Sequence, residues 1–298
     1  MNDLISVVIP VFNEKEAVEK VIKDVREVLK SGGYNYEIIA VDDGSTDGTG
    51  EILKELGIKV VRHPLTKGSG ASRKTGIRSA KGGVVVMIDA DGSYETKDIP
   101  EMLKCFPEYD QVIGARKKEM GTLPLLRGPV KWFIKTLAEY LAKTKIPDLN
   151  SGLRAVKTEV VKKFLWLIPD GFSCVSTMTL SFLCNGYSVK WIDTSYYSRL
   201  GKSKFHPLKD TYNYITTVIR IVMYFNPMRI FFPLGLIMFL AGVGRGIYNR
   251  YYSDAGTLQE GDIIIVVAAL IFIVLGLLAD LIVAQTRAQT YFSEKNNP

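Results

Sequence analysis

Short apolar segments alternate with amphipathic segments over the first third of the chain. Strands are predicted at Leu4–Val11, at residues 36–41 and at Lys59–Arg62, because these runs are apolar and rich in β-branched residues. Residues 85–88 form a fourth apolar run, which is too short to cross a membrane. Turn residues follow these runs, as expected where a buried strand ends.

Helices are predicted between these strands. Asn13 has the position of an N-cap with Glu16 at the third helical position, which predicts a helix to about Leu29. Further helices are predicted to about Leu56 and through Ala80. Strands that alternate with helices predict an α/β domain with a Rossmann-like, mainly parallel sheet. The ligands of such sheets bind beyond the carboxyl ends of the strands.

The fourth apolar run ends in two carboxylates, Asp89 and Asp91. Strand alternation would place both on one side and Ala90 on the other. Carboxylates this close repel each other, and a hard divalent cation such as Mg²⁺ or Mn²⁺ relieves the repulsion while leaving positions for a diphosphate. The competing interpretation is a solvated turn.

Three further segments are expected at the same edge of the sheet: residues 10–14, the pair Asp42 and Asp43, and the glycine-rich residues 67–73. The acidic pair is either good turn chemistry or a contact to the base or ribose of a nucleotide. The glycine-rich segment fits neither the dinucleotide fingerprint nor the Walker A pattern, which disfavours a nicotinamide dehydrogenase and a P-loop kinase.

Six motifs together resemble a known family. Those at residues 7–14, 41–47 and 89–91 are similar to the signature of family 2 inverting glycosyltransferases with the GT-A fold. Those at residues 114–116, 150–154 and 199–204 resemble the polyprenyl-phosphate glycosyltransferases, including dolichyl-phosphate mannose and glucose synthases. The resemblance extends over residues 5–204. It implies transfer of a hexose from a nucleotide sugar to dolichyl or undecaprenyl phosphate, with inversion.

The motifs and the resemblance give a set of expected site residues. Donor binding is expected from Pro10, Val11, Asn13, Glu14, Asp42, Asp43, Lys67, Asp89, Ala90 and Asp91, with Asp89 and Asp91 holding the metal. Catalytic roles are expected for Asp91, Arg116, Arg127, Arg199 and Lys204, and contacts to the acceptor phosphate for Arg116, Arg127, Ser151, Arg199 and Lys204.

The chemistry of a phosphate acceptor explains why cations are expected. A sugar hydroxyl must be deprotonated by a base, whereas a phosphate monoester, with a second pKa of about 6, is already charged at pH 7. Such an enzyme needs cations that bring two negative clusters together. For the expected cations, and for Lys202, the alternative is a solvated basic face; Arg154 is either functional or a structural ion-pair partner.

The residues after the metal motif bear on the donor. Many dolichyl-phosphate mannose synthases continue with Leu-Gln-His-Pro, whose Gln assists the metal, but this chain has Gly92-Ser93-Tyr94-Glu95. The difference favours UDP-glucose or UDP-N-acetylglucosamine over GDP-mannose as donor.

The last third of the chain is expected to enter a membrane. Residues 229–248 and 262–284 are long and apolar enough to span it. Residues 123–143 and 207–228 look like interfacial helices, and the alternative is that they are ordinary helices packed on the soluble domain. Cations flank the pair of spans on one side, which predicts a cytoplasmic catalytic domain (residues 1–206), a cytoplasmic tail (residues 286–298) and an external hairpin loop at the cell membrane. Arg245 and Asp280 lie near the span ends, where snorkelling explains them.

Composition narrows the classes of partner. The formal net charge of +7 fits phosphorylated substrates or anionic lipid, and no nucleic-acid-binding signature accompanies it. A homo-oligomer is left open. Two alternative functions remain: a processive or sugar-acceptor family 2 enzyme, whose usual Gln-x-x-Arg-Trp motif is absent, and a non-catalytic subunit that binds a nucleotide sugar.

Overall fold

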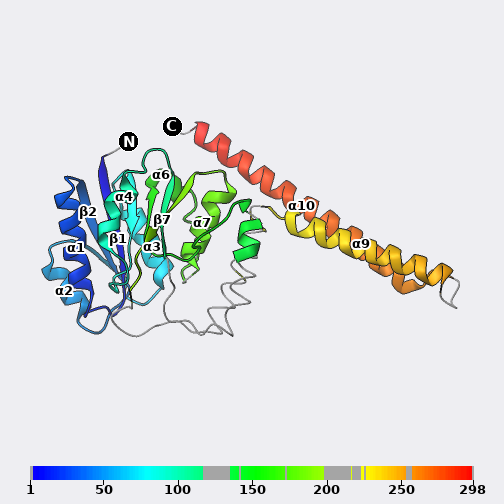
Figure 1. Ribbon diagram of the computed structural model, residues 1–298, viewed down its shortest axis with the longest axis horizontal. Helices are drawn as coiled ribbons and strands as arrows, with labels where there is room; N and C mark the ends of the chain where they lie inside the picture. The colour runs from blue at the N-terminus through cyan, green and yellow to red at the C-terminus, as the bar shows by residue number, and fades with distance from the viewer. Residues whose placement is uncertain are drawn as a thin grey trace. The chain divides into compact units, whose positions relative to one another are not determined.

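The computed structural model describes residues 3–116, 135–140, 142–171, 173–197, 216, 223–224, 226–252 and 257–296, with side chains up to residue 285. The chain divides into two compact units, Met1–Val218 and Ile219–Pro298 (Figure 1). The interfacial helix expected at residues 123–143 is described only in part, as helix over residues 135–140. Most of the segment expected at residues 207–228 lies outside the described residues.

The described strands of the first unit form one sheet, in the order β3-β2-β1-β4-β6-β5-β7. Strand β6 runs antiparallel to both of its neighbours, and the other pairs are parallel. The expected mainly parallel sheet is therefore confirmed. The strands are β1 Leu4–Val11, β2 Asn35–Asp42, β3 Lys59–Arg62, β4 Val84–Met87, β5 Gln111–Arg116, β6 Arg154–Lys157 and β7 Val189–Thr194.

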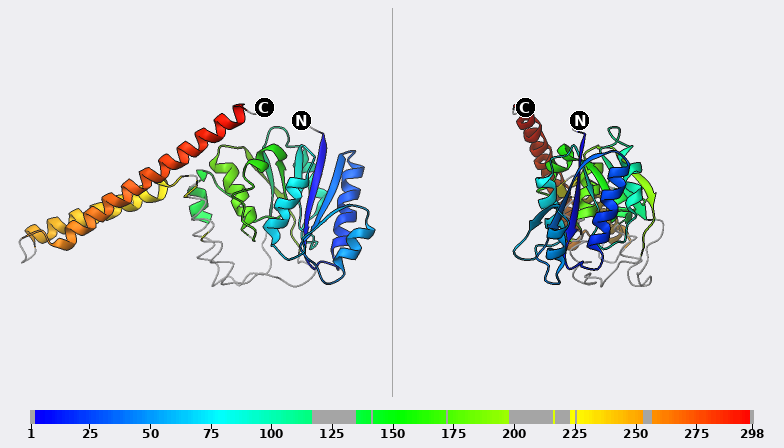
Figure 2. Two further views of the ribbon diagram at one scale, coloured as in Figure 1. Left: turned by 180° about the vertical axis from the view of Figure 1, so that it is seen from behind. Right: turned by 90° about the vertical axis from the view of Figure 1, so that its left-hand side faces the viewer.

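Helices cover both faces of this sheet (Figures 1 and 2). Alternate residues of β1 separate the two layers: Val7 and Ile9 belong to one buried cluster and Val8 to the other. The first cluster includes residues of α1 Val18–Ser31, α2 Thr49–Glu55 and α4 Ile99–Leu103. The second includes residues of α3 Ser69–Ser79, α6 Thr158–Lys163 and α7 Cys174–Cys184.

The start of α1 differs from the expectation. The helix begins at Val18, and Asn13 is not its N-cap. Asn13 has a positive φ of 53°, its N–H donates to Ser45 Oγ at 2.9 Å, and its Oδ1 accepts from the N–H of Thr46 at 2.8 Å. The capping pattern was misleading because these partners from the turn after β2 hold Asn13 in a loop.

Strand β4 also ends earlier than expected, at Met87. Asp89 and Asp91 therefore lie in the turn that follows the strand, and strand alternation does not orient them.

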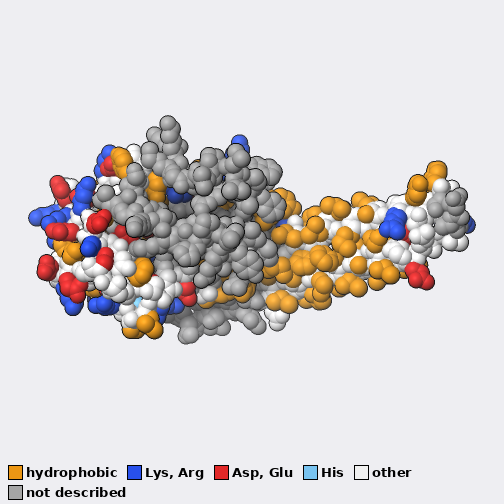
Figure 3. Space-filling view, turned by 90° about the horizontal axis from the view of Figure 1, so that it is seen from below, with side chains coloured by type: hydrophobic (Ala, Val, Ile, Leu, Met, Phe, Trp, Pro, Cys, Tyr) orange, Lys and Arg blue, Asp and Glu red, His pale blue; other side chains and the backbone are white. Residues whose placement is uncertain are grey.

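The second unit contains two long apolar helices, α9 Met228–Tyr251 and α10 Glu260–Asn296. Both are long and apolar enough to cross a membrane, and most of their side chains up to residue 285 are exposed. Figure 3 shows hydrophobic side chains along their surface. They pack closely where glycines occur: a Cβ at Gly235 would lie 2.5 Å from Ile273, and one at Gly276 would lie 2.5 Å from Phe231. Small residues allow such close contact between membrane helices.

A polar cluster joins the two helices near their connection. Asp262, which is buried, pairs with Arg245 (Nε to Oδ1, 3.1 Å) and accepts a hydrogen bond from Asn249 Nδ2 at 2.8 Å. Arg245 therefore has a carboxylate partner, whereas its sequence position had suggested snorkelling alone.

Candidate active site

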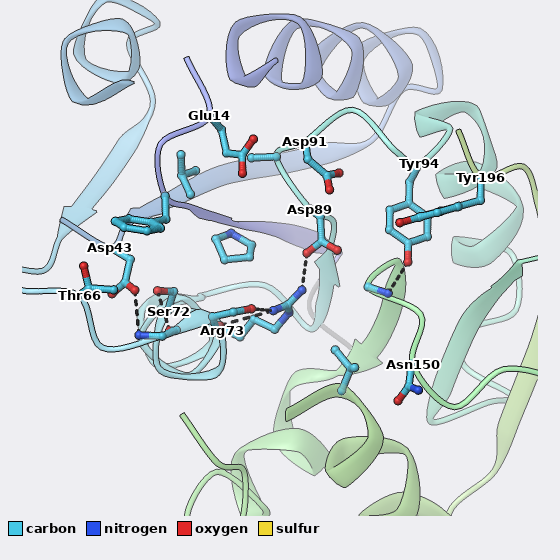
Figure 4. Close-up of a pocket in the computed structure, with 18 of the residues that line it drawn as sticks. Glu14, Asp43, Thr66, Ser72, Arg73, Asp89, Asp91, Tyr94, Asn150 and Tyr196 are labelled. Atoms are coloured by element: carbon cyan, nitrogen blue, oxygen red, sulfur yellow. Dashed lines mark hydrogen bonds and ion pairs between the residues drawn. The ribbon is translucent and has the colours of Figure 1, made fainter. Parts of the chain in front are cut away.

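A pocket of about 360 Å³ opens at the carboxyl ends of β1, β2 and β4 (Figure 4). This is the edge at which the sequence predicted a site. The pocket is lined by Pro10, Val11, Phe12, Glu14, Asp43, Thr66, Gly68, Ser69, Ser72, Arg73, Asp89, Ala90, Asp91, Tyr94, Arg116, Asn150, Gly152, Val175 and Tyr196.

Two neighbours fix the carboxylate of Asp89. The guanidinium of Arg73, from α3, forms an ion pair with Asp89 Oδ1 and is itself buried (Figure 4). Burial opposes the charge on Arg73, but Asp89 together with Cys174 and Tyr94 outweighs it, and the pKa of Arg73 is raised. On the other side, a Cβ at Gly152 would lie 2.1 Å from Asp89 Oδ2, so only glycine leaves room for this carboxylate.

The carboxylate of Asp91 is held by its own turn. Its Oδ1 accepts the N–H of Ser93 at 3.1 Å and the Ser93 hydroxyl at 2.5 Å. Ser93 is fully buried, so the serine found in place of glutamine supports the turn that carries Asp91.

The two acids after β2 have different environments. Asp42 is fully buried, and its Oδ1 accepts the N–H of Ser45 at 2.9 Å, which is turn chemistry. Asp43 lines the pocket, and it accepts three hydrogen bonds: from His63 Nδ1 at 2.7 Å, from the N–H of Lys67 at 2.9 Å and from the N–H of Gly68 at 2.8 Å. Of the pair, Asp43 alone is therefore positioned to meet a ligand in this pocket.

Three other expected donor residues differ in position. Glu14 lines the pocket, and its N–H donates to Thr49 Oγ1 at 3.0 Å. Asn13 contacts the turn after β2, and the exposed Lys67 contributes its backbone N–H to Asp43. A direct contact of the Asn13 or Lys67 side chain to a donor stays a prediction.

The glycine-rich loop serves packing. The N–H groups of Gly70 and Ala71 donate to the carbonyl oxygen of Asp170 at 2.7 and 3.2 Å. A Cβ at Gly68 would lie 2.4 Å from the same oxygen, and one at Gly70 would lie 2.0 Å from the carbonyl oxygen of Pro169. These amides are thus occupied by protein, unlike those of a phosphate-binding loop.

An aromatic pair closes the far end of the pocket. Tyr94 and Tyr196 meet edge to face, with centroids 5.1 Å apart, and the guanidinium of Arg116 lies 5.2 Å from the Tyr196 ring. The Tyr94 hydroxyl accepts the N–H of Gly152 at 2.7 Å. Burial, followed by the charge of Asp89, raises the pKa of Tyr94 to about 12, so the phenol stays protonated at neutral pH.

Arg116 lines the pocket and forms an ion pair with the carboxylate of Asp148. Its Nε and Nη2 donate to Oδ2 and Oδ1 of Asp148 at 2.7 and 2.9 Å. Although burial alone would raise the pKa of Asp148, the Arg116 guanidinium outweighs it and holds that pKa below its usual value. The bidentate contact fixes Arg116 and balances part of its charge.

Ser151 and Arg154 lie behind the pocket wall. Ser151 is fully buried and is not among the residues that line the pocket, and its expected contact to an acceptor phosphate stays a prediction. Arg154 is also fully buried and donates to the carbonyl oxygens of Val175 and Ser151, at 2.8 and 2.5 Å, and to Thr179 Oγ1 at 3.3 Å. Among the described residues, its hydrogen-bond partners are therefore carbonyl and hydroxyl oxygens, and none is an ion-pair partner. Burial lowers the pKa of Arg154 to about 10, which still leaves it charged at pH 7.

Arg127, Arg199, Lys202 and Lys204 lie outside the described residues, and their expected roles stay predictions.

The donor atoms of the pocket fit a divalent cation completed by substrate. Among the described residues, no three His, Cys, Asp or Glu side chains cluster as a full ligand set. Asp89 and Asp91 nevertheless line the same pocket. Mg²⁺ is commonly bound by one or two carboxylates, with phosphate oxygens and water as the other ligands.

Several pocket residues were not predicted as site residues: Phe12, Thr66, Ser72, Arg73, Tyr94, Asn150, Val175 and Tyr196. His63, which contacts Asp43, was also missed. One signal was available for Arg73, because it is a cation in the segment that was expected at this edge of the sheet. Phe12 and Ser72 also lie in segments expected at this edge, and Asn150 lies in the motif at residues 150–154. Thr66, Val175 and Tyr196 lie in no segment that the sequence singled out.

Comparisons with known proteins agree with this geometry. The profile of glycosyl transferase family 2 matches residues 6–165, and that of the GtrB C-terminal hairpin matches residues 226–284. The chain is 24% identical to the dodecaprenyl-phosphate galacturonate synthase of Rhizobium johnstonii, over 99% of this chain and 90% of that protein. It is 27% identical to the dolichyl-phosphate hexose transferase of Haloferax volcanii, over 69% of this chain and 88% of that protein.

A solved structure shares the fold of the first unit. The crystal structure of glucosyl-3-phosphoglycerate synthase from Mycobacterium tuberculosis, in complex with Mn²⁺, UDP-glucose and phosphoglyceric acid, superposes with a TM-score of 0.56 at 19% identity. The superposition covers 73% of this chain and 79% of that one. It confirms the expected GT-A fold. With the family profile matching more than half of the sequence, the chain belongs to glycosyl transferase family 2.

Proposed function

We propose that this protein transfers one hexose from a nucleoside diphosphate sugar to a polyprenyl phosphate, with inversion, and so makes a lipid-phosphate sugar. One observation carries the proposal: Asp43, Asp89 and Asp91 line a single pocket in a chain that also has an apolar helical hairpin. The relatives named dodecaprenyl-phosphate galacturonate synthase and dolichyl-phosphate hexose transferase support a lipid phosphate as acceptor.

On the donor side, Asp43 is proposed to receive the base or ribose of the nucleotide, while residues 10–14 form the adjoining wall. UDP-glucose or UDP-N-acetylglucosamine is the favoured donor, with GDP-mannose as the alternative. The Gly-Ser-Tyr sequence after Asp91 supports this order, because Ser93 stands where the mannose synthases have glutamine.

Asp89 and Asp91 are proposed to hold Mg²⁺ or Mn²⁺. When bound, the cation stabilises the departing diphosphate as a Lewis acid. The charges of the pocket support this role. Its lining includes the carboxylates of Glu14, Asp43, Asp89 and Asp91 but only two guanidiniums among the described residues, those of Arg73 and Arg116. A diphosphate would meet net repulsion there without additional positive charge.

On the acceptor side, the phosphate itself is the proposed nucleophile. It is charged at pH 7, so the protein must orient it and balance its charge, and no general base is required. Arg116 is a described cation that lines the pocket beside Tyr196. Arg127, Arg199 and Lys204 are proposed to complete this group from the part of the chain outside the described residues.

The hairpin is proposed to anchor the enzyme in the cell membrane, with the catalytic unit and the C-terminus in the cytoplasm. The excess of lysine and arginine on that side of the spans supports this orientation. A lipid acceptor would then reach the enzyme from the bilayer.

A donor screen tests the proposal. The full chain, in detergent or vesicles, is incubated with undecaprenyl or dolichyl phosphate, Mn²⁺ and one radiolabelled nucleotide sugar at a time. We expect label in organic-extractable lipid with one of the UDP sugars and none with Asp91→Asn. Label that enters a growing polysaccharide would indicate a processive synthase. UDP binding without any transfer would indicate a non-catalytic subunit.

A further inference from the structure

Three side chains connect helix α3 to the donor pocket. Thr75 Oγ1, on α3, lies 2.9 Å from His63 Nε2, and His63 Nδ1 lies 2.7 Å from Asp43 Oδ1. His63 follows β3 directly and is only 5% exposed, and Asp43 is 3% exposed. The hydrogen bonds that link Thr75, His63 and Asp43 are therefore largely shielded from water. A hydrogen bond in such surroundings constrains its partners more than one in solvent.

The chemistry of the two groups shows which of them donates the hydrogen bond between His63 and Asp43. A carboxylate only accepts hydrogen bonds, so His63 Nδ1 carries the proton and donates to Asp43. The hydroxyl of Thr75 serves either ring state, because it can donate to a neutral Nε2 or accept from a protonated one. Thr75 therefore fixes the plane of the ring, and the ring fixes one oxygen of Asp43.

The carboxylate of Asp43 is left with a defined capacity for a ligand. Oδ1 accepts from His63 and from the N–H of Lys67, whereas Oδ2 accepts from the N–H of Gly68. Each carboxylate oxygen has about two lone-pair sites. The second lone pair of Asp43 Oδ2 therefore remains to accept a hydrogen bond from an N–H or O–H group of a ligand in the pocket.

We infer that His63, held by Thr75, is a positioning residue of the donor site, which orients Asp43 so that Oδ2 receives the nucleotide. The inference rests on the proposed role of Asp43 in binding the donor. His63 itself does not line the pocket, so it acts through Asp43.

A purely structural role for His63 makes a different prediction. In that case its loss would lower the thermal stability without changing nucleotide affinity in the protein that remains folded. The positioning role predicts weaker binding of the nucleotide, a higher KM for the donor and little change in kcat at saturating donor.

The test uses the full chain with UDP and Mn²⁺, and measures the dissociation constant of UDP, the kinetic constants and the melting temperature. His63→Leu removes the hydrogen bond to Asp43 and should weaken UDP binding about tenfold, as expected for loss of one contact to a buried charge. His63→Asn can place an amide N–H near the position of Nδ1 and should restore the affinity for UDP to within about threefold of the wild-type value.

Two substitutions at Thr75 form a matched pair that alters the support of His63 without changing His63 or Asp43. Thr75→Val removes the hydroxyl at nearly constant shape and should weaken UDP binding about threefold. Thr75→Ser keeps the hydroxyl and should bind as the wild type does. In the His63→Leu background, Thr75→Val should have no further effect, because the two residues act through one contact.

Two results would overturn the inference: UDP affinity within twofold of wild type in folded His63→Leu, or equal affinities for the Thr75→Val and Thr75→Ser proteins. The second comparison decides the matter if His63→Leu does not fold. Asp43→Ala separates this inference from the proposed function. Unchanged UDP affinity in Asp43→Ala would refute the donor role of Asp43 itself, whereas weaker binding there together with normal binding in His63→Leu refutes only the positioning role.

Discussion

At the scale of single residues, three of the carboxylates that line the pocket already have protein partners that orient them. Asp89 has Arg73, Asp91 has Ser93, and Asp43 has three N–H donors. Because these partners belong to the fold, the carboxylates need little rearrangement when a ligand arrives. Such preorganisation is the main source of electrostatic catalysis.

Asp91 offers the first prediction. Asp91→Asn keeps the shape of the side chain but removes its charge, so transfer should fall by at least about 10²-fold, because stabilisation of the leaving diphosphate depends on the cation. Chelation by EDTA should reproduce the loss in the wild type. Glu159→Gln, an exposed substitution on α6, is the control and should leave activity unchanged. Full activity of either Asp91→Asn or the chelated enzyme would contradict the assignment.

The pair of Arg116 and Asp148 predicts a dependence of stability on pH. The pKa of Asp148 in the folded protein lies below its ordinary value of about 3.9, because Arg116 outweighs the effect of burial. The stabilisation is therefore fully present above about pH 4 and is lost as the pH falls through the lowered pKa. Asp148→Asn should cost about 3 kcal/mol at pH 7, since it leaves a buried guanidinium without its counter-charge.

Thermal unfolding between pH 3 and pH 7 measures this effect. The difference in melting temperature between the wild type and Asp148→Asn should be widest near pH 7 and should narrow below pH 4. Asp170→Asn is the control, because the Asp170 side chain is 63% exposed and its pair with Lys74 should contribute little. A gap that stays constant over this range would refute the assigned ion pair.

Sequence reasoning at this scale found the residues that stand directly after strands. Asp43, Asp89 and Asp91 were predicted because an apolar run ends at each of them, and the structure places all three on one pocket. Asp148 could not be found in this way, because its partner Arg116 lies 32 residues away along the chain. His63 does follow a predicted strand, but its contact with Asp43, 20 residues away, leaves no mark in the local sequence. Such contacts exist only after the sheet has formed.

At the scale of elements, the turn after β4 depends on the segment that precedes β6. Gly152 packs against Asp89 and donates its N–H to Tyr94, so the two segments shape the site together. Gly152→Ala should push Asp89 from its place, because the added Cβ would lie 2.1 Å from Oδ2. We expect transfer to fall at least about tenfold, with a smaller effect on the melting temperature because the carboxylate end of Asp89 can move.

Gly171→Ala is the matched control for this substitution. A Cβ at Gly171 would meet nothing within 4 Å, so activity and stability should stay near wild type. Equal activity of the two alanine variants would show that the contact between Gly152 and Asp89 does not matter.

The bounds of an element were predicted well where burial of apolar residues determined them. They were predicted poorly where the prediction relied on a helix-capping pattern. Strand β1 was predicted with its observed bounds, because a buried parallel strand is apolar at nearly every position. The helix start at Asn13 was wrong, because hydrogen bonds to Ser45 and Thr46 outweighed a local capping pattern. No local window contains those partners.

At the scale of the whole molecule, the two units imply different solvents. The first unit has a core built on both faces of a sheet, whereas the second exposes apolar side chains along two helices. The proposed orientation predicts that the connection between α9 and α10 faces the outside. A cysteine at Thr257, in a Cys184→Ser background, should react with a membrane-impermeant maleimide only from the external side of sealed vesicles.

A cysteine at Glu159, in the first unit, is the counterpart of this experiment and should react only from the cytoplasmic side. Position 254, also expected outside, lies beyond the described residues and should behave as position 257 does. Modification of Thr257→Cys from the cytoplasmic side would refute the orientation.

The mass and anomeric configuration of the lipid product test the central claim most directly. With the nucleotide sugar selected by the donor screen, transfer to the phosphate predicts a polyprenyl phosphate heavier by one hexosyl residue, with a single phosphorus atom and a β-linkage from an α-linked donor. The released nucleotide should be the diphosphate. A product with two phosphorus atoms and a released monophosphate, or retention of configuration at the anomeric carbon, would contradict inverting transfer to a phosphate acceptor.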